Sequence, residues 1–116
     1  MGSIVSANCE CGLSIDAMRL GHGMAYREIS IFPYYCKDCK TFFLEDSYSN
    51  DIKCSSCDSY NVVGYNNPEV AKKLEPTAFN WYNQKNNTSL KLGREGSLCP
   101  RCNKFLLQFE TIGSWD

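Results

Sequence analysis

Residues 36–57 read CKDCKTFFLEDSYSNDIKCSSC, a stretch that begins and ends with a Cys-x-x-Cys motif. Such a motif places two sulfur atoms on one tight turn, which suits a tetrahedral metal ion that takes two ligands from each of two turns. Between the motifs, residues 40–44 and 51–53 are typical of two short strands, and the polar residues 47–50 of the turn that joins them. The stretch therefore predicts a β-hairpin with a metal ion at its base.

Two further cysteine pairs flank this stretch and complete a set of eight cysteines. Four thiolates bind one tetrahedral Zn²⁺, so four pairs predict two sites and two structural zinc ions. The pairs near the two ends of the chain, one of them shortened to Cys-x-Cys, are expected to share the second site. The predicted ligands are Cys36, Cys39, Cys54 and Cys57 in site 1, and Cys9, Cys11, Cys99 and Cys102 in site 2.

Other pairings of the four cysteine motifs stay open at this point. Consecutive pairing would place a long insertion, residues 58–98, inside one site. Interleaved pairing would give a cross-brace like that of RING domains, which normally include a histidine ligand in the middle of the series. The single histidine, His22, lies instead between the first two cysteine pairs. Nested pairing is favoured because the short spacing between Cys39 and Cys54 fits one hairpin.

The two cysteine turns around the predicted hairpin resemble those of zinc-ribbon proteins. In that fold group two such turns, called knuckles, clamp one metal ion beneath a short antiparallel hairpin, which a third strand usually extends. The resemblance implies a third strand at residues 61–65, after the second knuckle. With two such units the chain is also similar to small bacterial double zinc-ribbon proteins without an assigned activity. The resemblance therefore implies a fold and a metal, but no reaction.

The residue that follows each knuckle is expected to adopt a positive φ, which lets backbone N–H groups point at the sulfur atoms. Gly12 and Asn103 suit this conformation, because glycine lacks a Cβ atom and asparagine tolerates the left-handed region. Asp58 tolerates it as well, whereas Lys40 is the least suited of the four. The knuckle before Lys40 is therefore the one whose sequence departs furthest from the pattern.

The predicted fold is a small, metal-stabilised, mainly β protein in which a central zinc ribbon is nested inside an outer one. Residues 1–35 and 93–116 form the outer split ribbon, residues 36–65 the central ribbon, and residues 66–92 a connection that contains a helix and a loop. Alternation of apolar and polar residues predicts the strands of the outer ribbon at 13–18, 25–32 and 105–112.

The connection is expected to begin with one short helix over residues 67–74. Asn67 is a suitable N-cap, Pro68 occupies the first helical position, and Pro76 ends the helix. The polar residues 83–89 read as a loop. Before them lies an aromatic cluster that forms either a partner-binding patch or a lid on the core: Phe79, Trp81 and Tyr82.

The composition is that of a globular protein with a thin core, since 43% of the 116 residues are hydrophobic but no long apolar face occurs. Small domains of this kind usually need disulfides or metal ions to be stable. No stretch is long and apolar enough to span a bilayer, and no signal segment opens the chain, which indicates a cytoplasmic protein without a membrane partner. A reducing compartment keeps thiols free for metal, whereas four disulfides in a secreted protein are the alternative.

The cysteine motifs do not by themselves define an activity. A hydrolytic zinc enzyme leaves one ligand position open for water and usually employs histidine ligands beside a glutamate base, and this chain has one histidine. No catalytic residue is assigned, and we lean against an enzyme. Cys-x-x-Cys pairs also serve redox chemistry, and Cys₄ sites hold iron in rubredoxin, so a redox or electron-transfer protein is one alternative.

The favoured function is a zinc-stabilised interaction module, without catalysis of its own, that binds a protein. A nucleic-acid-binding ribbon is the second alternative, because single-strand binders stack bases on aromatic rings. The net charge of −1 and the sequence pI near 5.8 disfavour it, since nucleic-acid binders present a basic face. The rings available for stacking would be Tyr34, Tyr35, Phe42 and Phe43.

Overall fold

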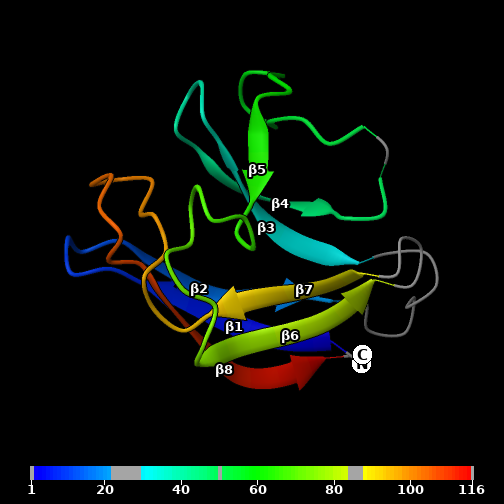
Figure 1. Cartoon of the computed structure of the whole chain (residues 1–116), viewed down its shortest axis with the longest axis vertical. Coiled ribbons are helices and arrows are strands. Elements are labelled where there is room, and N and C mark those ends of the chain that lie inside the picture. The colour runs from blue at the N-terminus through cyan, green and yellow to red at the C-terminus, as the bar shows by residue number, and fades with distance from the viewer. Residues whose placement is uncertain (1, 22–29, 50, 84–87, 116) are drawn as a thin grey trace.

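The computed structural model describes residues 2–21, 30–49, 51–83 and 88–115, which form a mainly β protein (Figure 1). Within these ranges eight strands are arranged in two three-stranded sheets, with orders β2-β1-β8 and β4-β3-β5, and one hairpin, β6-β7. All of the strand pairs are antiparallel. The strands are β1 (Gly2–Asn8), β2 (Ser14–Leu20), β3 (Ile31–Cys36), β4 (Phe42–Asp46), β5 (Val62–Gly64), β6 (Thr77–Asn83), β7 (Thr88–Gly93) and β8 (Gln108–Trp115).

The sheets β2-β1-β8 and β4-β3-β5 have the same arrangement of strands and knuckles. We call the first sheet the outer ribbon and the second the central ribbon. In each ribbon the first strand lies in the middle, and a knuckle precedes each of the two flanking strands. The register is also the same in both ribbons. The residue just before the first knuckle pairs with two residues: one lies three positions after the last cysteine of the first knuckle, and the other lies six positions after the last cysteine of the second knuckle. These partners are Asn8 with Ser14 and Gln108, and Tyr35 with Phe42 and Val63.

The central ribbon is inserted between β2 and the second knuckle of the outer ribbon. Gly21 and Ile31 join the two ribbons through a pair of backbone hydrogen bonds of 2.9 and 2.8 Å. At the other end of the outer ribbon, Gly2 of β1 pairs with Trp115 of β8, so the two chain ends lie side by side (Figure 1). The chain therefore starts and finishes in the same sheet and builds a second ribbon in between.

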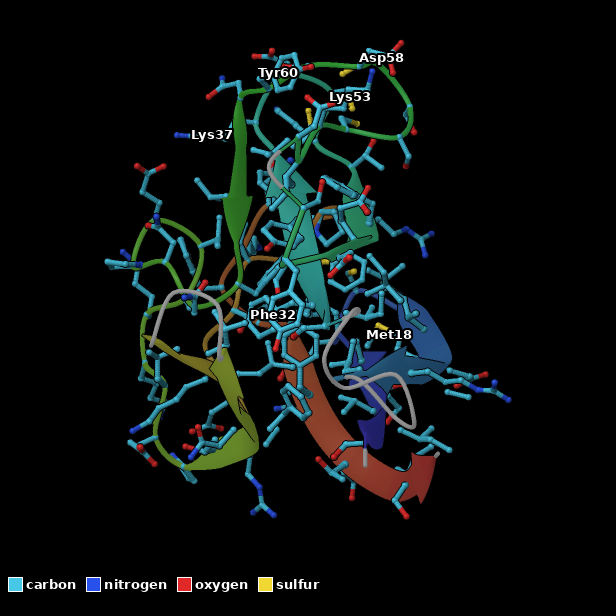
Figure 2. All side chains as sticks on the ribbon, turned by 90° about the vertical axis from the view of Figure 1, so that its right-hand side faces the viewer. Met18, Phe32, Lys37, Lys53, Asp58 and Tyr60 are labelled. Carbon is cyan, nitrogen blue, oxygen red and sulfur yellow. The ribbon has the colours of Figure 1, made fainter. Side chains whose placement is uncertain are left out.

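The two ribbons share one hydrophobic core, whose residues come from both sheets and from the β6-β7 hairpin. Aromatic rings make the contact: Phe42 of the central ribbon lies 6.3 Å from Phe109 of the outer one, and Tyr65 lies 5.7 Å from Phe109, measured between ring centroids. The Tyr65 hydroxyl donates a hydrogen bond of 2.7 Å to the carbonyl of Leu98. Figure 2 shows Phe32, another core residue, in the middle of the molecule.

The β6-β7 hairpin lies against β8 and closes the core on that side. The hydroxyl of Thr111 donates a hydrogen bond to the carbonyl of Ala78, and Leu92 is fully buried. At the end of β7 the backbone passes so close to Lys73 that a Cβ atom on Gly93 would lie 2.3 Å from the Lys73 carbonyl oxygen. Sequence analysis had placed only a helix and a loop in this connection, because its polar residues hide the strand pattern.

The helix predicted over residues 67–74 is wrong, since the described part of the chain contains no helix. The Asn67 carbonyl accepts 3.0 Å hydrogen bonds from the N–H groups of Val70 and Ala71, which makes a single turn. The chain then pairs with a distant segment: Lys72 donates to Gly96, and Leu98 donates to Val70. This long-range pairing overrides the local helix signal. No helix in the described ranges is long and apolar enough to cross a membrane.

The strand pairing within the central ribbon also differs from the prediction. Residues 51–53 form no strand, and the partner of β4 is β3, which precedes the first knuckle. The predicted third strand at 61–65 is confirmed as β5, which pairs with the other side of β3. Asp46 ends β4, because its carboxylate accepts hydrogen bonds of 2.9 and 3.0 Å from the N–H groups of Ser30 and Tyr48.

The outer ribbon is centred on a strand that sequence analysis missed. The predicted strands at 13–18 and 105–112 correspond to β2 and β8, but both of them pair with β1 at the start of the chain. Of the third predicted strand, 25–32, residues 25–29 lie outside the described residues, and Ile31 and Phe32 belong to β3. The proposed domain limits at residues 35, 65 and 92 stay a prediction.

Candidate metal centres

The first cluster, which we call the outer site, joins the cysteine pair near the start of the sequence to the pair near its end. Cys9 and Cys11 follow β1, and Cys99 and Cys102 precede β8. Their four Sγ atoms lie within 4.8 Å of one another. The Sγ atoms of Cys9 and Cys102 are 3.7 Å apart, and those of Cys11 and Cys99 are 3.6 Å apart.

The second cluster, the central site, lies at the end of the molecule where Figure 2 labels Lys53, Asp58 and Tyr60. It joins the knuckle after β3 to the knuckle before β5, and its four Sγ atoms also lie within 4.8 Å of one another. The Sγ–Sγ distance is 3.6 Å between Cys36 and Cys57 and 3.4 Å between Cys39 and Cys54. The structure thus gathers all eight cysteines into two groups of four.

The spacing of the sulfur atoms fits a metal cage. A tetrahedral zinc ion with Zn–S bonds of about 2.3 Å holds its sulfur atoms about 3.8 Å apart. The four distances above, 3.4 to 3.7 Å, are close to that value, whereas a disulfide would require about 2.05 Å. All eight cysteines are free thiols. Both clusters therefore have the ligand type and the geometry to hold a metal ion.

The backbone of each knuckle is closed by a hydrogen bond across its base. In the three Cys-x-x-Cys knuckles the first cysteine donates its N–H, at 2.9 Å, to the carbonyl five residues later. In the shortened Cys-x-Cys knuckle, Cys9 donates at 2.9 Å to Leu13, four residues later, so the loss of one residue leaves the closure intact. The three longer closures join Cys36 to Thr41, Cys54 to Ser59, and Cys99 to Lys104.

The residue after each knuckle adopts the left-handed conformation, as predicted. Gly12 has a φ of 102°, and Lys40, Asp58 and Asn103 have φ values of 58°, 59° and 58°. The lysine, which is the least suited residue, therefore takes the same conformation as the asparagine in the other ribbon. The knuckle imposes this geometry because it must turn the chain within two residues and return it to the sheet.

Backbone N–H groups point at the sulfur atoms and favour their ionised form. The Ser56 N–H lies 3.3 Å from the Cys54 Sγ atom. Burial alone would raise the pKa of Cys54, but backbone donors and its neighbours lower it to about 7. The Leu13 N–H likewise lowers the pKa of Cys11 to about 7, whereas burial raises the pKa of Cys9 to about 12. Neighbouring thiolates repel each other, so a cation is needed before all four can ionise.

The two sites differ in how the protein covers them. In the outer site Cys99 is buried, Cys9 and Cys102 are half-buried against the main core, and Cys11 is exposed. In the central site Cys36 and Cys54 are fully buried, but Cys39 and Cys57 are exposed. The two buried cysteines of the central site form a small second core with Phe43, against which Tyr34 and Val62 pack.

The residues considered for partner binding are only partly within reach of a partner. Phe79 is 5% exposed and belongs to the main core, and the side chains of Trp81 and Tyr82 lie outside the described residues. The predicted patch therefore stays a prediction for those two. Of the rings considered for base stacking, Tyr35 and Phe43 are buried, and the other two, Tyr34 and Phe42, are half-buried.

Ion pairs are distributed over the surface of the described residues. Most of them join a lysine to a carboxylate from another segment, and none involves an arginine within the described ranges. Each of these four lysines therefore has a carboxylate beside its positive charge. The four lysines do not form a large basic face. The pairs are Lys37–Glu69 at 2.6 Å, Lys53–Asp58 at 3.9 Å, Lys73–Glu95 at 2.6 Å and Lys91–Glu75 at 3.0 Å.

No protein-family model, curated protein or solved structure matches this chain. Its likeness to zinc ribbons rests on the two four-cysteine clusters in a small, mainly β protein, which are compatible with that fold group.

Proposed function

We propose that the protein is a zinc-stabilised interaction module, with two structural Zn²⁺ ions and a protein as its partner. The observation that carries the proposal is the pair of complete four-thiol clusters. A tetrahedral zinc ion with four protein ligands has no position left for water, which is the arrangement of structural rather than hydrolytic sites. When bound, each zinc ion would neutralise part of the charge of its thiolates and cross-link two knuckles.

We expect the metal to hold the end of the central ribbon that carries the knuckles, because little apolar material lies there outside the shared core. β5 contains three residues, all of them half-buried, and the second core near the site has three residues. A cluster of three buried residues contributes too little apolar burial to fix both knuckles by itself. Metal binding can supply free energy for folding, as it does in zinc fingers.

The outward edge of β4 is the surface that we assign to a protein partner. Among the described strands β4 pairs only with β3, and the side chain of Leu44 on this strand is 38% exposed. An extended peptide can add a strand to such an edge through backbone hydrogen bonds. By contrast, the edge strand β2 of the outer ribbon is interrupted by a bulge, where Ala17 has a φ of 51°. A bulge of this kind protects an edge from further pairing.

The first experiment is native mass spectrometry of the freshly purified protein, which reports metal identity, metal number and disulfide formation together. We expect two zinc ions per chain and no loss of hydrogen from the cysteines. Iron in the same sites would favour the redox alternative. A metal-free chain that is lighter by pairs of hydrogens would contradict the proposal.

The partner surface is tested by cross-linking in an extract of the host cell with two matched variants. Leu44→Lys places a charge on the β4 edge, whereas Tyr60→Lys places the same charge on a residue that is 64% exposed and lies outside the strands. We expect cross-linked proteins to be lost with the first variant and kept with the second. Equal loss would argue against the edge, and salt-sensitive binding of oligonucleotides would favour the nucleic-acid alternative.

A further inference from the structure

The central site exposes two of its sulfur-bearing residues, and they come from different knuckles. Cys39 and Cys57 are each the second cysteine of a Cys-x-x-Cys motif, and both are exposed. Their Sγ atoms lie within 4.8 Å of each other. No other pair of exposed cysteines occurs in either cluster, because only Cys11 is exposed in the outer site.

We propose that Cys39 and Cys57 are a peroxide-sensitive pair, whose oxidation to a disulfide releases the metal ion of the central site. The inference rests on the proposed function, since it requires that the site holds zinc. Hydroperoxides oxidise cysteines that are accessible to solvent more readily than buried ones, and Cys39 and Cys57 are both exposed. A disulfide needs its sulfur atoms about 2.05 Å apart, so the two knuckles must move towards each other to form it.

The reaction balances with hydrogen peroxide as the oxidant. The Cys39 thiolate attacks one peroxide oxygen, so that an S–O bond forms, the O–O bond breaks and hydroxide leaves. The Cys57 thiolate then attacks the resulting sulfenic acid, so that the S–S bond forms and a second hydroxide leaves. The two sulfur atoms give up two electrons, the peroxide accepts both, and zinc stays divalent. The order of the two cysteines can be reversed without changing the balance.

Loss of these two ligands leaves the metal with Cys36 and Cys54, both of them buried. Two thiolates hold zinc far more weakly than four, so the ion leaves. The knuckle around Lys37 is linked to the segment before β5, since the Lys37 N–H donates a 2.9 Å hydrogen bond to the carbonyl of Asn61. Oxidation would therefore loosen β5, while the outer ribbon keeps its own cross-link.

The outer site provides the internal control for the experiment. Its thiols Cys9, Cys99 and Cys102 contact the main core, so Cys11 is its one exposed cysteine. The full-length protein is loaded with zinc, its metal content is measured, and hydrogen peroxide is added in equimolar amount. Released zinc is followed with a coloured chelator, and disulfides are located by peptide mass spectrometry after alkylation of free thiols.

We expect one of two zinc ions to be released, with a disulfide between Cys39 and Cys57, and release of the second ion about tenfold slower or more. Simultaneous release of both ions, earlier release from the outer site, or a first disulfide between other cysteines would overturn the inference. A chain that holds no zinc before the addition of peroxide overturns the proposed function instead, and the inference with it. The metal analysis before oxidation thus separates the two failures.

Discussion

Replacing Lys40 with glycine is expected to stabilise the zinc-loaded protein, because Lys40 is held at a φ of 58°. The left-handed conformation costs an L-residue roughly 1–2 kcal/mol, and glycine avoids this cost. Glycine loses about 0.5–1 kcal/mol more backbone entropy on folding, so the net gain is about 0.5–1 kcal/mol. For a chain of this size that corresponds to a rise in Tm of about 2–4 °C.

The side chain of Lys40 does not complicate this estimate. It is exposed and takes part in none of the ion pairs among the described residues. Lys40→Ala is the matched control, because alanine removes the same charge but keeps the Cβ atom that makes the conformation costly. Asn103→Gly in the outer ribbon should give a smaller gain or none, since asparagine tolerates this region of φ and its side chain accepts a 3.4 Å hydrogen bond from the Tyr35 hydroxyl.

The assay is thermal unfolding of the wild type and the three variants at one fixed concentration of free zinc. The zinc concentration must be held constant because a ligand that binds only the folded state raises Tm by mass action. We expect Lys40→Gly to unfold at a higher temperature than Lys40→Ala. Equal melting temperatures for these two variants would refute the reasoning, since backbone strain would then contribute nothing at the knuckle.

Three further predictions concern the metal, the pH dependence and the packing. Cys36→Ser should remove one of two zinc ions and Cys99→Ser the other, as counted by native mass spectrometry; unchanged metal content would contradict the assignment of ligands. Burial raises the pKa of Tyr34 to about 12, above an ordinary value of about 10, so its contribution to stability is complete below pH 10 and is lost towards pH 12. The free energy of unfolding should therefore fall more steeply in that window for the wild type than for Tyr34→Phe, and parallel curves would argue against it. Gly93→Ala should destabilise by about 1–3 kcal/mol because its Cβ atom would collide with the Lys73 carbonyl, whereas Gly113→Ala, whose nearest new contact is at 3.7 Å, should unfold close to the wild type in urea.

The knuckles are the part of this fold that a single sequence predicts best. Cysteine spacing limits the possible chemistry to metal or disulfide, and the short distance between Cys39 and Cys54 fits one hairpin. The left-handed residues after the knuckles follow from the same geometry, and even Lys40 conforms. Tight turns with two ligands leave the backbone few choices, so local sequence carries the information.

The strand partners could not be obtained in the same way, because they depend on segments far apart in the chain. β4 pairs with the strand before its knuckle rather than with residues 51–53. In both ribbons a strand leads into the first knuckle. This regularity, applied to the sequence, would have predicted β3 before Cys36 and β1 before Cys9. The turn at Asn67 carries every local signal of a helix start, but pairing of residues 70–72 with 96–98 decides its structure.

The nesting of one ribbon inside the other sets an order on assembly during synthesis, which proceeds from the N-terminus. All four ligands of the central site have left the ribosome once Cys57 has emerged. The outer site must wait for Cys99 and Cys102, and until then Cys9 and Cys11 lack the other two cysteines of their cluster. A translation product that stops before residue 99 would therefore have all four cysteines of the central site but only two of the outer site, beside an unpaired edge of β1.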